Sequence, residues 1–280
     1  MSATVSMRDA LYEAPGPKTR KRVLVGTAIS LVLLALGIAF VIRQFYINDQ
    51  LNPKYWSFFG RWTTWRFLLK GLWGTIKVAA TAGVMAMALG LLLMLGRISP
   101  NKLLSSACHV ITEIFRSLPS LLLIYFFFLV IPKYGIRMPS FWMITIPVSL
   151  AASGVLAEVF RAGVNAVPKG QVEAAMSLGM THGKITRKIV LPQALKIVIP
   201  SLVSQLVVVV KDTTVAYVVS YPDLMQNARV LISNYDALVS MYFVVAIIYI
   251  AINYATNQFS VYLAHRMGTQ VVSRMDENPV

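Results

Sequence analysis

The stretch GQVEAAMSLGMTHGKITRKIVLP, residues 170–192, is a polar interruption in a chain that is otherwise strongly apolar. Its core reads Glu173-Ala174-Ala175, then three residues, Gly179, nine residues, Ile189, one residue, and Leu191-Pro192. Long apolar runs flank it on both sides, so the pattern predicts a loop held at a membrane surface. Such a loop is displayed to a soluble partner.

The composition excludes a soluble globular protein. Of the 280 residues, 57% are hydrophobic and 13% are charged, and the mean hydropathy is +0.66. The net charge of +15 comes from Lys and Arg at the ends of apolar runs, where anionic lipid headgroups and the positive-inside bias select them. Because no nucleic-acid motif accompanies these cations, the expected partner is membrane lipid and no nucleic acid. The lone cysteine, Cys108, excludes an intramolecular disulfide.

The apolar runs predict an all-α polytopic membrane protein with about six transmembrane helices. The expected spans cover residues 23–42, 67–95, 103–131, 141–164, 197–220 and 237–263. The expected organisation is an N-terminal tail (1–22), an extra transmembrane helix (23–46), an interfacial segment (47–66), a transporter domain (67–265) with a central loop (165–196), and a C-terminal tail (266–280).

The distribution of cations sets the expected orientation. Counting spans from a cytoplasmic N-terminus places the 97–102 turn, the central loop and the C-terminus inside, and the central loop carries five cations against one acid. The segment 43–70 disagrees, because it falls outside and still holds five cations. The stronger charge bias of the central loop decides the orientation.

Within the central loop, the residues predict a short helix over about 171–178. Gly179 then fits the left-handed position that often ends a helix and that a Cβ disfavours. Small side chains at Ala174 and Ala175 would let a partner groove approach the backbone closely. The alternative is a solvent-exposed connecting loop without a binding role, which explains neither the paired alanines nor the position of Gly179.

The central motif resembles, without a departure, the EAA loop in the membrane subunits of bacterial ATP-binding-cassette (ABC) importers. Four further segments are similar to the polar amino-acid permeases of the histidine, glutamine and glutamate type: EIFRSLP at 113–119, AEVFR at 157–161, VPKGQ at 167–171 and KDT at 211–213. The likeness covers about residues 67–265, a five-helix core to which the first helix is an addition. The opening LYEAPGP at 11–17, followed by a basic cluster, is similar to glutamate permease subunits of actinobacterial type.

The resemblance implies that this loop couples transport to a separate motor. The residues it assigns to the coupling helix are Glu173, Ala174, Ala175, Ser177, Leu178 and Gly179. The implied partners are two ABC ATPase subunits, a second permease subunit that is a different homologous chain, and an extracellular solute-binding protein. The implied location is the bacterial cytoplasmic membrane, and the implied solute is L-glutamate.

The chain itself is expected to be a non-catalytic subunit with no cofactor and no metal of its own. The segment from Gly179 to Thr186 has only three residues between its glycines, and Ile185 follows Lys184 where a phosphate loop needs Ser or Thr. ATP and magnesium are therefore expected on the partner ATPase.

Charged residues inside predicted spans are candidates for the solute path, because each costs about 2.5 to 3.5 kcal/mol on insertion scales. Glu113 and Arg116, like Glu158 and Arg161, stand three apart and can pair on one helix surface. Such pairs could neutralise each other, or line or gate the solute path. A second group, deeper in the fifth span, could contact solute or pair against another subunit: Lys211, Asp212, Thr213 and Thr214.

The competing interpretation is a secondary amino-acid carrier driven by an ion gradient. Such carriers usually show repeated halves, and here only the short EIFRS/EVFRA echo is present. An intramembrane enzyme lacks any motif. The sequence leaves open which amino acid is carried, whether two different permease chains pair, and which of them holds the solute.

Overall fold

The computed structural model describes residues 16–266, and the chain divides into two compact units, Met1–Ser57 and Phe58–Val280. All regular elements in the described part are helices. The all-α prediction is confirmed, and five helices are long and apolar enough to cross a membrane, or six if one bent pair counts as a span. The predicted tails fall largely outside the described residues.

The first unit is built around helix α2 (Pro17–Ile47), whose described side chains are almost all exposed. It starts six residues before the predicted apolar run, because a proline at the first helical position is preorganised for a helix and lacks only an N–H that would be unpaired there. At 1.5 Å per residue, its 31 residues span about 46 Å, more than the roughly 30 Å of a hydrocarbon core. An apolar helix with no protein around it in its own unit is suited to lipid or to another chain. A short 3-10 helix, η1 (Pro53–Tyr55), follows it.

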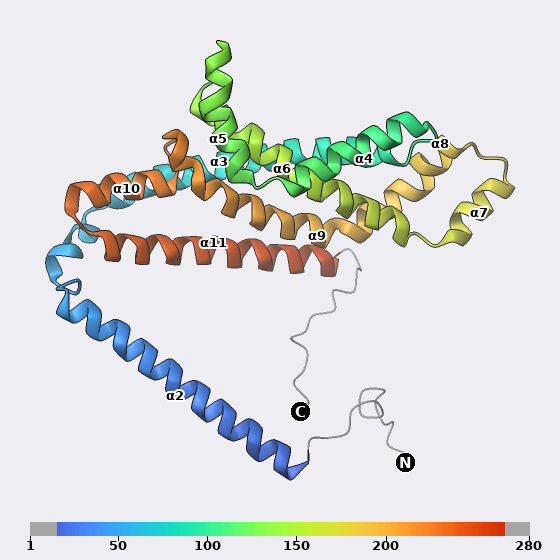
Figure 1. The fold of residues 1–280 in the computed structure, drawn as a ribbon. Coiled ribbons are helices and arrows are strands. Elements are labelled where there is room, and N and C mark those ends of the chain that lie inside the picture. Colours follow the sequence, from blue (N-terminus) through green and yellow to red (C-terminus); the bar gives the residue numbers. More distant parts are fainter. Residues whose placement is uncertain (1–15, 267–280) are drawn as a thin grey trace. The chain divides into compact units, whose positions relative to one another are not determined.

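The boundary between the units falls in the 3-10 turn η2 (Ser57–Gly60). The second unit packs three long helices side by side: α3 (Trp62–Arg97), α6 (Ser140–Ala166) and α9 (Leu191–Asp212) (Figure 1). Their facing residues form the main core, in which Val78, Ala82, Val148 and Val209 are almost fully buried. This unit holds the predicted transporter domain.

Small residues let these helices approach closely. A Cβ added at Gly90 of α3 would lie 2.9 Å from the Cβ of Leu156 on α6, and one at Gly163 of α6 would lie 2.9 Å from the carbonyl oxygen of Ala194 on α9. Within a membrane, burial from water does not drive helix association, so close packing at such small residues stabilises the bundle.

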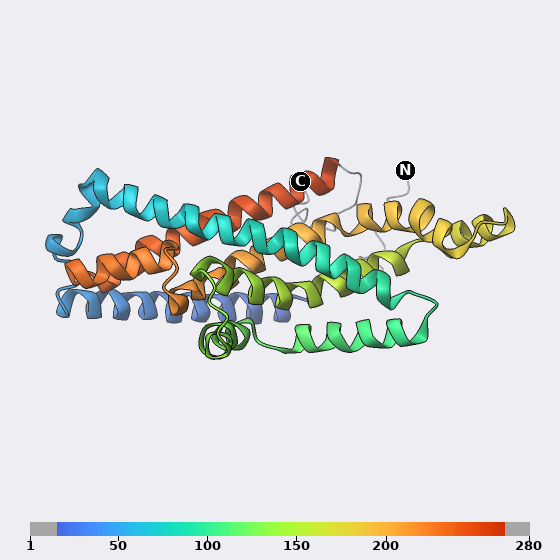
Figure 2. The ribbon, with the colours of Figure 1, turned by 90° about the horizontal axis from the view of Figure 1, so that it is seen from above.

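The third predicted span, 103–131, is not one straight helix. Helix α4 (Lys102–Ser117) ends at the extended Leu118, and α5 (Ser120–Tyr125) continues at an angle of 95°. Pro119 is the reason, because a proline disfavours helical backbone in the residue before it. Figure 2 shows α5 end-on, with α4 lying across the view. A π-helical turn, η3 (Phe126–Val130), and a 3-10 turn, η4 (Ile131–Tyr134), complete this arm.

The predicted central loop is largely helical. It contains α7 (Lys169–Ser177), α8 (His182–Ile185) and the π-helical turn η5 (Thr186–Val190), which runs directly into α9. In Figure 1, α7 and α8 lie at the same end of the second unit as the turn between α3 and α4. This agrees with the prediction that both connections lie on one side of the membrane.

At the opposite end, the chain makes a helix that the sequence analysis did not predict. The 3-10 helix η6 (Thr213–Val219) extends α9, and α10 (Leu224–Tyr235) then precedes the last long helix, α11 (Leu238–Arg266). Helix α10 is tied to α3, because the Nδ2 of Asn227 donates to the carbonyl oxygen of Phe67 at 2.7 Å and Leu224 N–H donates to Thr75 Oγ1 at 3.1 Å.

Candidate functional site

The predicted docking helix in the central loop is present as α7. It begins two residues before the expected Gln171 and ends in a Schellman motif, in which Met180 N–H donates to the carbonyl oxygen of Ala175 at 3.2 Å and Gly179 N–H donates to that of Met176 at 2.9 Å. Gly179 has φ +73°, the left-handed conformation that its position predicted. The end of α7 is therefore fixed by the backbone.

The structure divides the predicted coupling residues between two faces of α7. Ala175 is only 4% exposed and packs with Val167, Ile185, Val190 and Ala194. Leu178, by contrast, is 82% exposed. Glu173, Ala174, Met176 and Ser177 are also exposed. Ala175 thus anchors the helix to α8, η5 and α9, while the exposed side chains of α7 and of Leu178, directly after it, offer polar and apolar groups to a partner.

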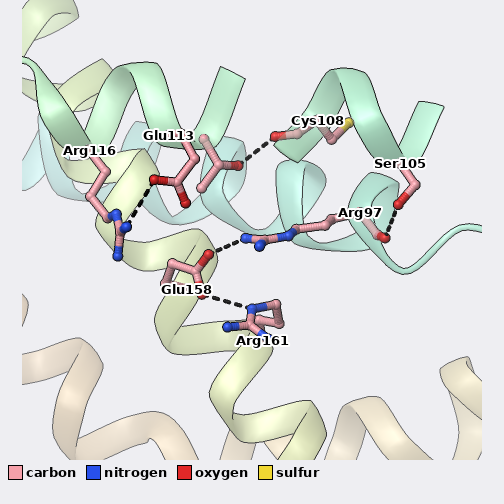
Figure 3. Close-up of polar contacts among 8 residues, drawn as sticks. Arg97, Ser105, Cys108, Glu113, Arg116, Glu158 and Arg161 are labelled. Carbon is pink, nitrogen blue, oxygen red and sulfur yellow. Dashed lines mark hydrogen bonds and ion pairs between the residues drawn. The ribbon is translucent and has the colours of Figure 1, made fainter. Parts of the chain in front are cut away.

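A cluster of ion pairs lies between the ends of α3 and α6 (Figure 3). Glu158 accepts a hydrogen bond from Arg161 Nε at 2.8 Å and another from Arg97 Nη1, so one carboxylate bridges two guanidinium groups. Arg97 and Glu158 have 19% and 18% of their side chains exposed. The predicted Glu158–Arg161 pair is confirmed as a contact, whereas Arg97 was missed because it is 61 residues away from Glu158 in the chain.

The second predicted pair, Glu113 and Arg116 of α4, is also in contact, at 2.9 Å. It is more open, with 38% and 48% of the side chains exposed. These two residues continue a polar face of α4, which consists, from the start of the helix, of Lys102, Ser105, Ser106, His109, Glu113 and Arg116. Charged groups in a membrane helix face protein or water, so this face belongs against an aqueous cavity or a neighbouring chain.

The third predicted group lies where α9 changes into the 3-10 helix η6. Asp212 is the last residue of α9, and its carboxylate lies close to Ser120, the first residue of α5 after the 95° bend. The end of α9 therefore approaches the broken span of α4 and α5 at Asp212. Broken helices near mid-membrane are a recurrent way to build solute sites, because they free polar backbone groups.

The neighbours of Asp212 point their hydroxyl groups back to the helix. Thr213 is fully buried and its Oγ1 donates to the carbonyl oxygen of Val210 at 2.7 Å, while Thr214 donates to that of Lys211 at 2.7 Å. Lys211 is exposed. In the described part of the chain no ion pair joins Lys211 to Asp212, and neither contacts the Glu113 or Glu158 clusters.

A buried carboxylate that the sequence analysis missed is Asp223, just before α10. It is fully buried, and its Oδ1 accepts the N–H of Gln226 at 2.7 Å and so caps the helix, while its Oδ2 has no partner among the described residues. Burial raises the pKa of Asp223 to about 6. An Asp directly before an amphipathic segment was the available signal for this helix start.

Comparisons with known proteins identify relatives over most of the chain. Residues 86–269 match the family model described as "Binding-protein-dependent transport system inner membrane component". The glutamate transport system permease protein GluD of Corynebacterium glutamicum is 34% identical over 241 residues, which are 83% of this chain and 88% of that protein. The probable glutamine ABC transporter permease protein GlnP of Bacillus subtilis is 34% identical, over 68% of this chain and 88% of that protein.

Solved structures agree with this fold. An amino acid ABC transporter crystallised with histidines is matched with a TM-score of 0.68 and 27% identity, covering 72% of this chain and 94% of that one. The methionine ABC transporter MetNI, in an inward-facing conformation, is matched with a TM-score of 0.62 and 19% identity, covering 74% of this chain and 99% of that one, and shows the shared fold.

Proposed function

This chain belongs to the family of binding-protein-dependent transport system inner membrane components, and on that premise we propose that it forms the translocation path for L-glutamate in an ATP-driven importer. Membership makes it a permease subunit of an amino acid ABC importer, held in a membrane by several helices. The competing secondary carrier finds no support, since the relatives are permease proteins of transport systems.

The proposed mechanism rests on which residues of α7 are buried and which are exposed. Ala175 anchors the helix, and Leu178, directly after its last residue, is 82% exposed, as Glu173, Ala174 and Ser177 are also exposed. A surface leucine so exposed on a short, firmly ended helix fits a groove in a soluble partner. We assign that partner as the ATPase, with one copy on each of two permease chains.

Force would pass from α7 into the membrane through the cluster around Ala175. That cluster joins α7 to η5 and to the first residues of α9. Helix α9 ends at Asp212, so a displacement of α7 is transmitted along one helix to the place where α9 meets α5. This connection supplies a physical route between ATP-driven closure and the solute path.

The proposed solute path contains Lys211, Asp212, Thr213 and Thr214, with Glu158, Arg161, Glu113 and Arg116 nearer the α7 end. Asp212 can accept the ammonium group of an amino acid, and Lys211 can pair with a carboxylate. The Glu158 cluster is held by two arginines, which suits it to gating or bracing more than to recognition.

The remaining assembly follows from the same proposal. A second, homologous permease would pair with this chain, a solute-binding protein would deliver the amino acid from outside, and both termini would lie in the cytoplasm of a bacterium. ATP and magnesium would bind the ATPase, since this chain lacks a phosphate loop.

Reconstitution tests the proposal. The chain should co-purify with an ATPase, and proteoliposomes holding the full complex should take up radiolabelled L-glutamate when ATP is enclosed. Unlabelled glutamate should compete well, and glutamine or histidine poorly. Uptake without ATP, driven by an imposed ion gradient, would contradict the importer assignment, whereas equal competition by glutamine would contradict only the solute.

A further inference from the structure

A polar pocket of about 500 Å³ lies between the end of α3, the first turns of α4 and the last turns of α6. The lining residues that carry the argument are Arg97, Lys102, Ser105, His109, Arg161 and Asn165. It shares no residue with the solute group at Asp212. Almost every side chain around it can donate a hydrogen bond.

The charges around this pocket do not cancel. Arg97 and Arg161 share a single carboxylate, that of Glu158, which leaves one positive charge in excess. Lys102 adds a second, and within residues 16–266 it makes no ion pair. Each arginine has five N–H donors, and its hydrogen bond to Glu158 uses one of them, so donors remain for a further acceptor. The pocket is therefore suited to an anion.

The chemistry of the pocket favours a phosphate over an amino acid. A zwitterion brings an ammonium group that needs an acidic acceptor, but no acid lines the pocket, and both oxygens of the neighbouring Glu158 are already held by arginines. A phosphate diester brings only negative charge and acceptor oxygens. Fork-shaped guanidinium groups and a free lysine are common partners of phosphate.

The position of the pocket indicates where the phosphate comes from. It lies where the apolar helix α3 ends and α4 begins, the level at which a spanning helix reaches the headgroups. Leu103 and Leu104, next to Lys102, are 81% and 46% exposed and offer an apolar rim to acyl chains. Basic pockets between transmembrane helices on the cytoplasmic side bind anionic lipid headgroups.

We propose that this pocket binds the headgroup phosphate of an anionic phospholipid in the leaflet that faces α7. Only the choice of the inner leaflet rests on the proposed function. Asn165 lies in the last turn of α6, four residues before α7 begins at Lys169, so a bound headgroup braces the segment that carries the coupling helix. Transport would then depend on the anionic lipid content of the membrane.

The test uses the full transporter complex in nanodiscs of phosphatidylcholine with a minor fraction of phosphatidylglycerol, and native mass spectrometry counts the phosphatidylglycerol retained. Removing one lysine near the surface costs about 1 kcal/mol, so Lys102→Gln should weaken retention about fivefold, and Lys102→Gln with His109→Gln should weaken it further. Lys133→Gln, which removes an exposed lysine of η4 outside the pocket, is the matched control and should retain lipid as the unaltered protein does.

Two results would overturn the proposal. One is equal retention of phosphatidylglycerol by Lys102→Gln and the control. The other is stabilisation in pure phosphatidylcholine nanodiscs by inorganic phosphate or by glutamate, lost in Lys102→Gln, with no phosphatidylglycerol retained, which would assign the pocket to a soluble anion. Lipid retention is measured without ATP, so a failure to find ATP-driven uptake would contradict the proposed function and leave this result standing.

Discussion

Arg97, the last residue of α3, donates a hydrogen bond to Glu158 of α6 and so joins two helices through a carboxylate that also accepts from Arg161. The Glu113–Arg116 pair has the same three-residue spacing but stays on one helix. The pairs Glu158–Arg161 and Glu113–Arg116 look alike in sequence, but only Glu158 also makes a tertiary contact, with Arg97. Their different surroundings give the first prediction.

Replacing Glu158 by Gln should destabilise the protein by about 2 kcal/mol, because two partly buried guanidinium groups lose the charged acceptor that they share. Glu113→Gln is the matched control and should cost below about 1 kcal/mol, since its pair is open to solvent. Thermal unfolding of the purified chain in nanodiscs measures both. Equal losses would show that Arg97 adds nothing to the Glu158 pair.

The sequence predicted these pairs because helix geometry alone brings residues three apart together. It could not predict Arg97, since the partner of a residue at the end of one span depends on how α3 and α6 cross. The bend at Pro119 had a local signal, a proline within the predicted span 103–131, but the apolar run continued through it. Gly179 was predicted correctly because its conformation is decided by its own missing Cβ.

The helix α10 was missed for a different reason. Its 12 residues are too few and too polar to be recognised as a span, and its contacts with α3 depend on glycines far away in the chain. A Cβ at Gly71 would lie 2.6 Å from the carbonyl oxygen of Asp223, and one at Gly74 would lie 2.5 Å from that of Pro222. No pattern within α10 itself predicts that the backbone before it lies so close to α3.

The exposed face of α7 gives the second prediction. Leu178→Asp should abolish co-purification of the ATPase, because a charged group would replace the apolar side chain that enters the partner's groove. The unfolding temperature of the permease chain should not change, since Leu178 is 82% exposed. Gln171→Asp, an exposed substitution on the same helix, is the control and should still bind the ATPase. A pull-down from detergent, followed by ATPase assay, reads out both variants.

The position of Asp212 close to Ser120 gives the third prediction. Asp212→Asn should reduce ATP-driven uptake tenfold or more while leaving assembly with the ATPase intact, because the amide cannot pair with an ammonium group. Ser120→Ala, which removes a hydroxyl group close to the carboxylate, should produce a smaller loss. Ser201→Ala, at an exposed position of α9, is the control. Normal uptake by Asp212→Asn would remove this residue from the solute path.

Asp223 gives a prediction about pH, because burial raises its pKa from 3.8 to about 6. The folded protein then holds this proton more tightly than the unfolded chain does, so the contribution to stability is complete below about pH 4 and is lost as the pH rises through 6. The shift corresponds to a free energy on the order of 3 kcal/mol.

Asp223→Asn should remove this pH dependence, because the amide oxygen can still cap α10 at Gln226 N–H while no charge forms beside the unpartnered Oδ2 position. At pH 7.5 the variant should unfold at a higher temperature than the unaltered chain, and near pH 4.5 the difference should shrink. Asp236→Asn, at the exposed far end of the same helix, should leave the pH profile unchanged. If Asp223→Asn and the unaltered chain kept parallel profiles between pH 4.5 and 7.5, another group would have to account for the titration.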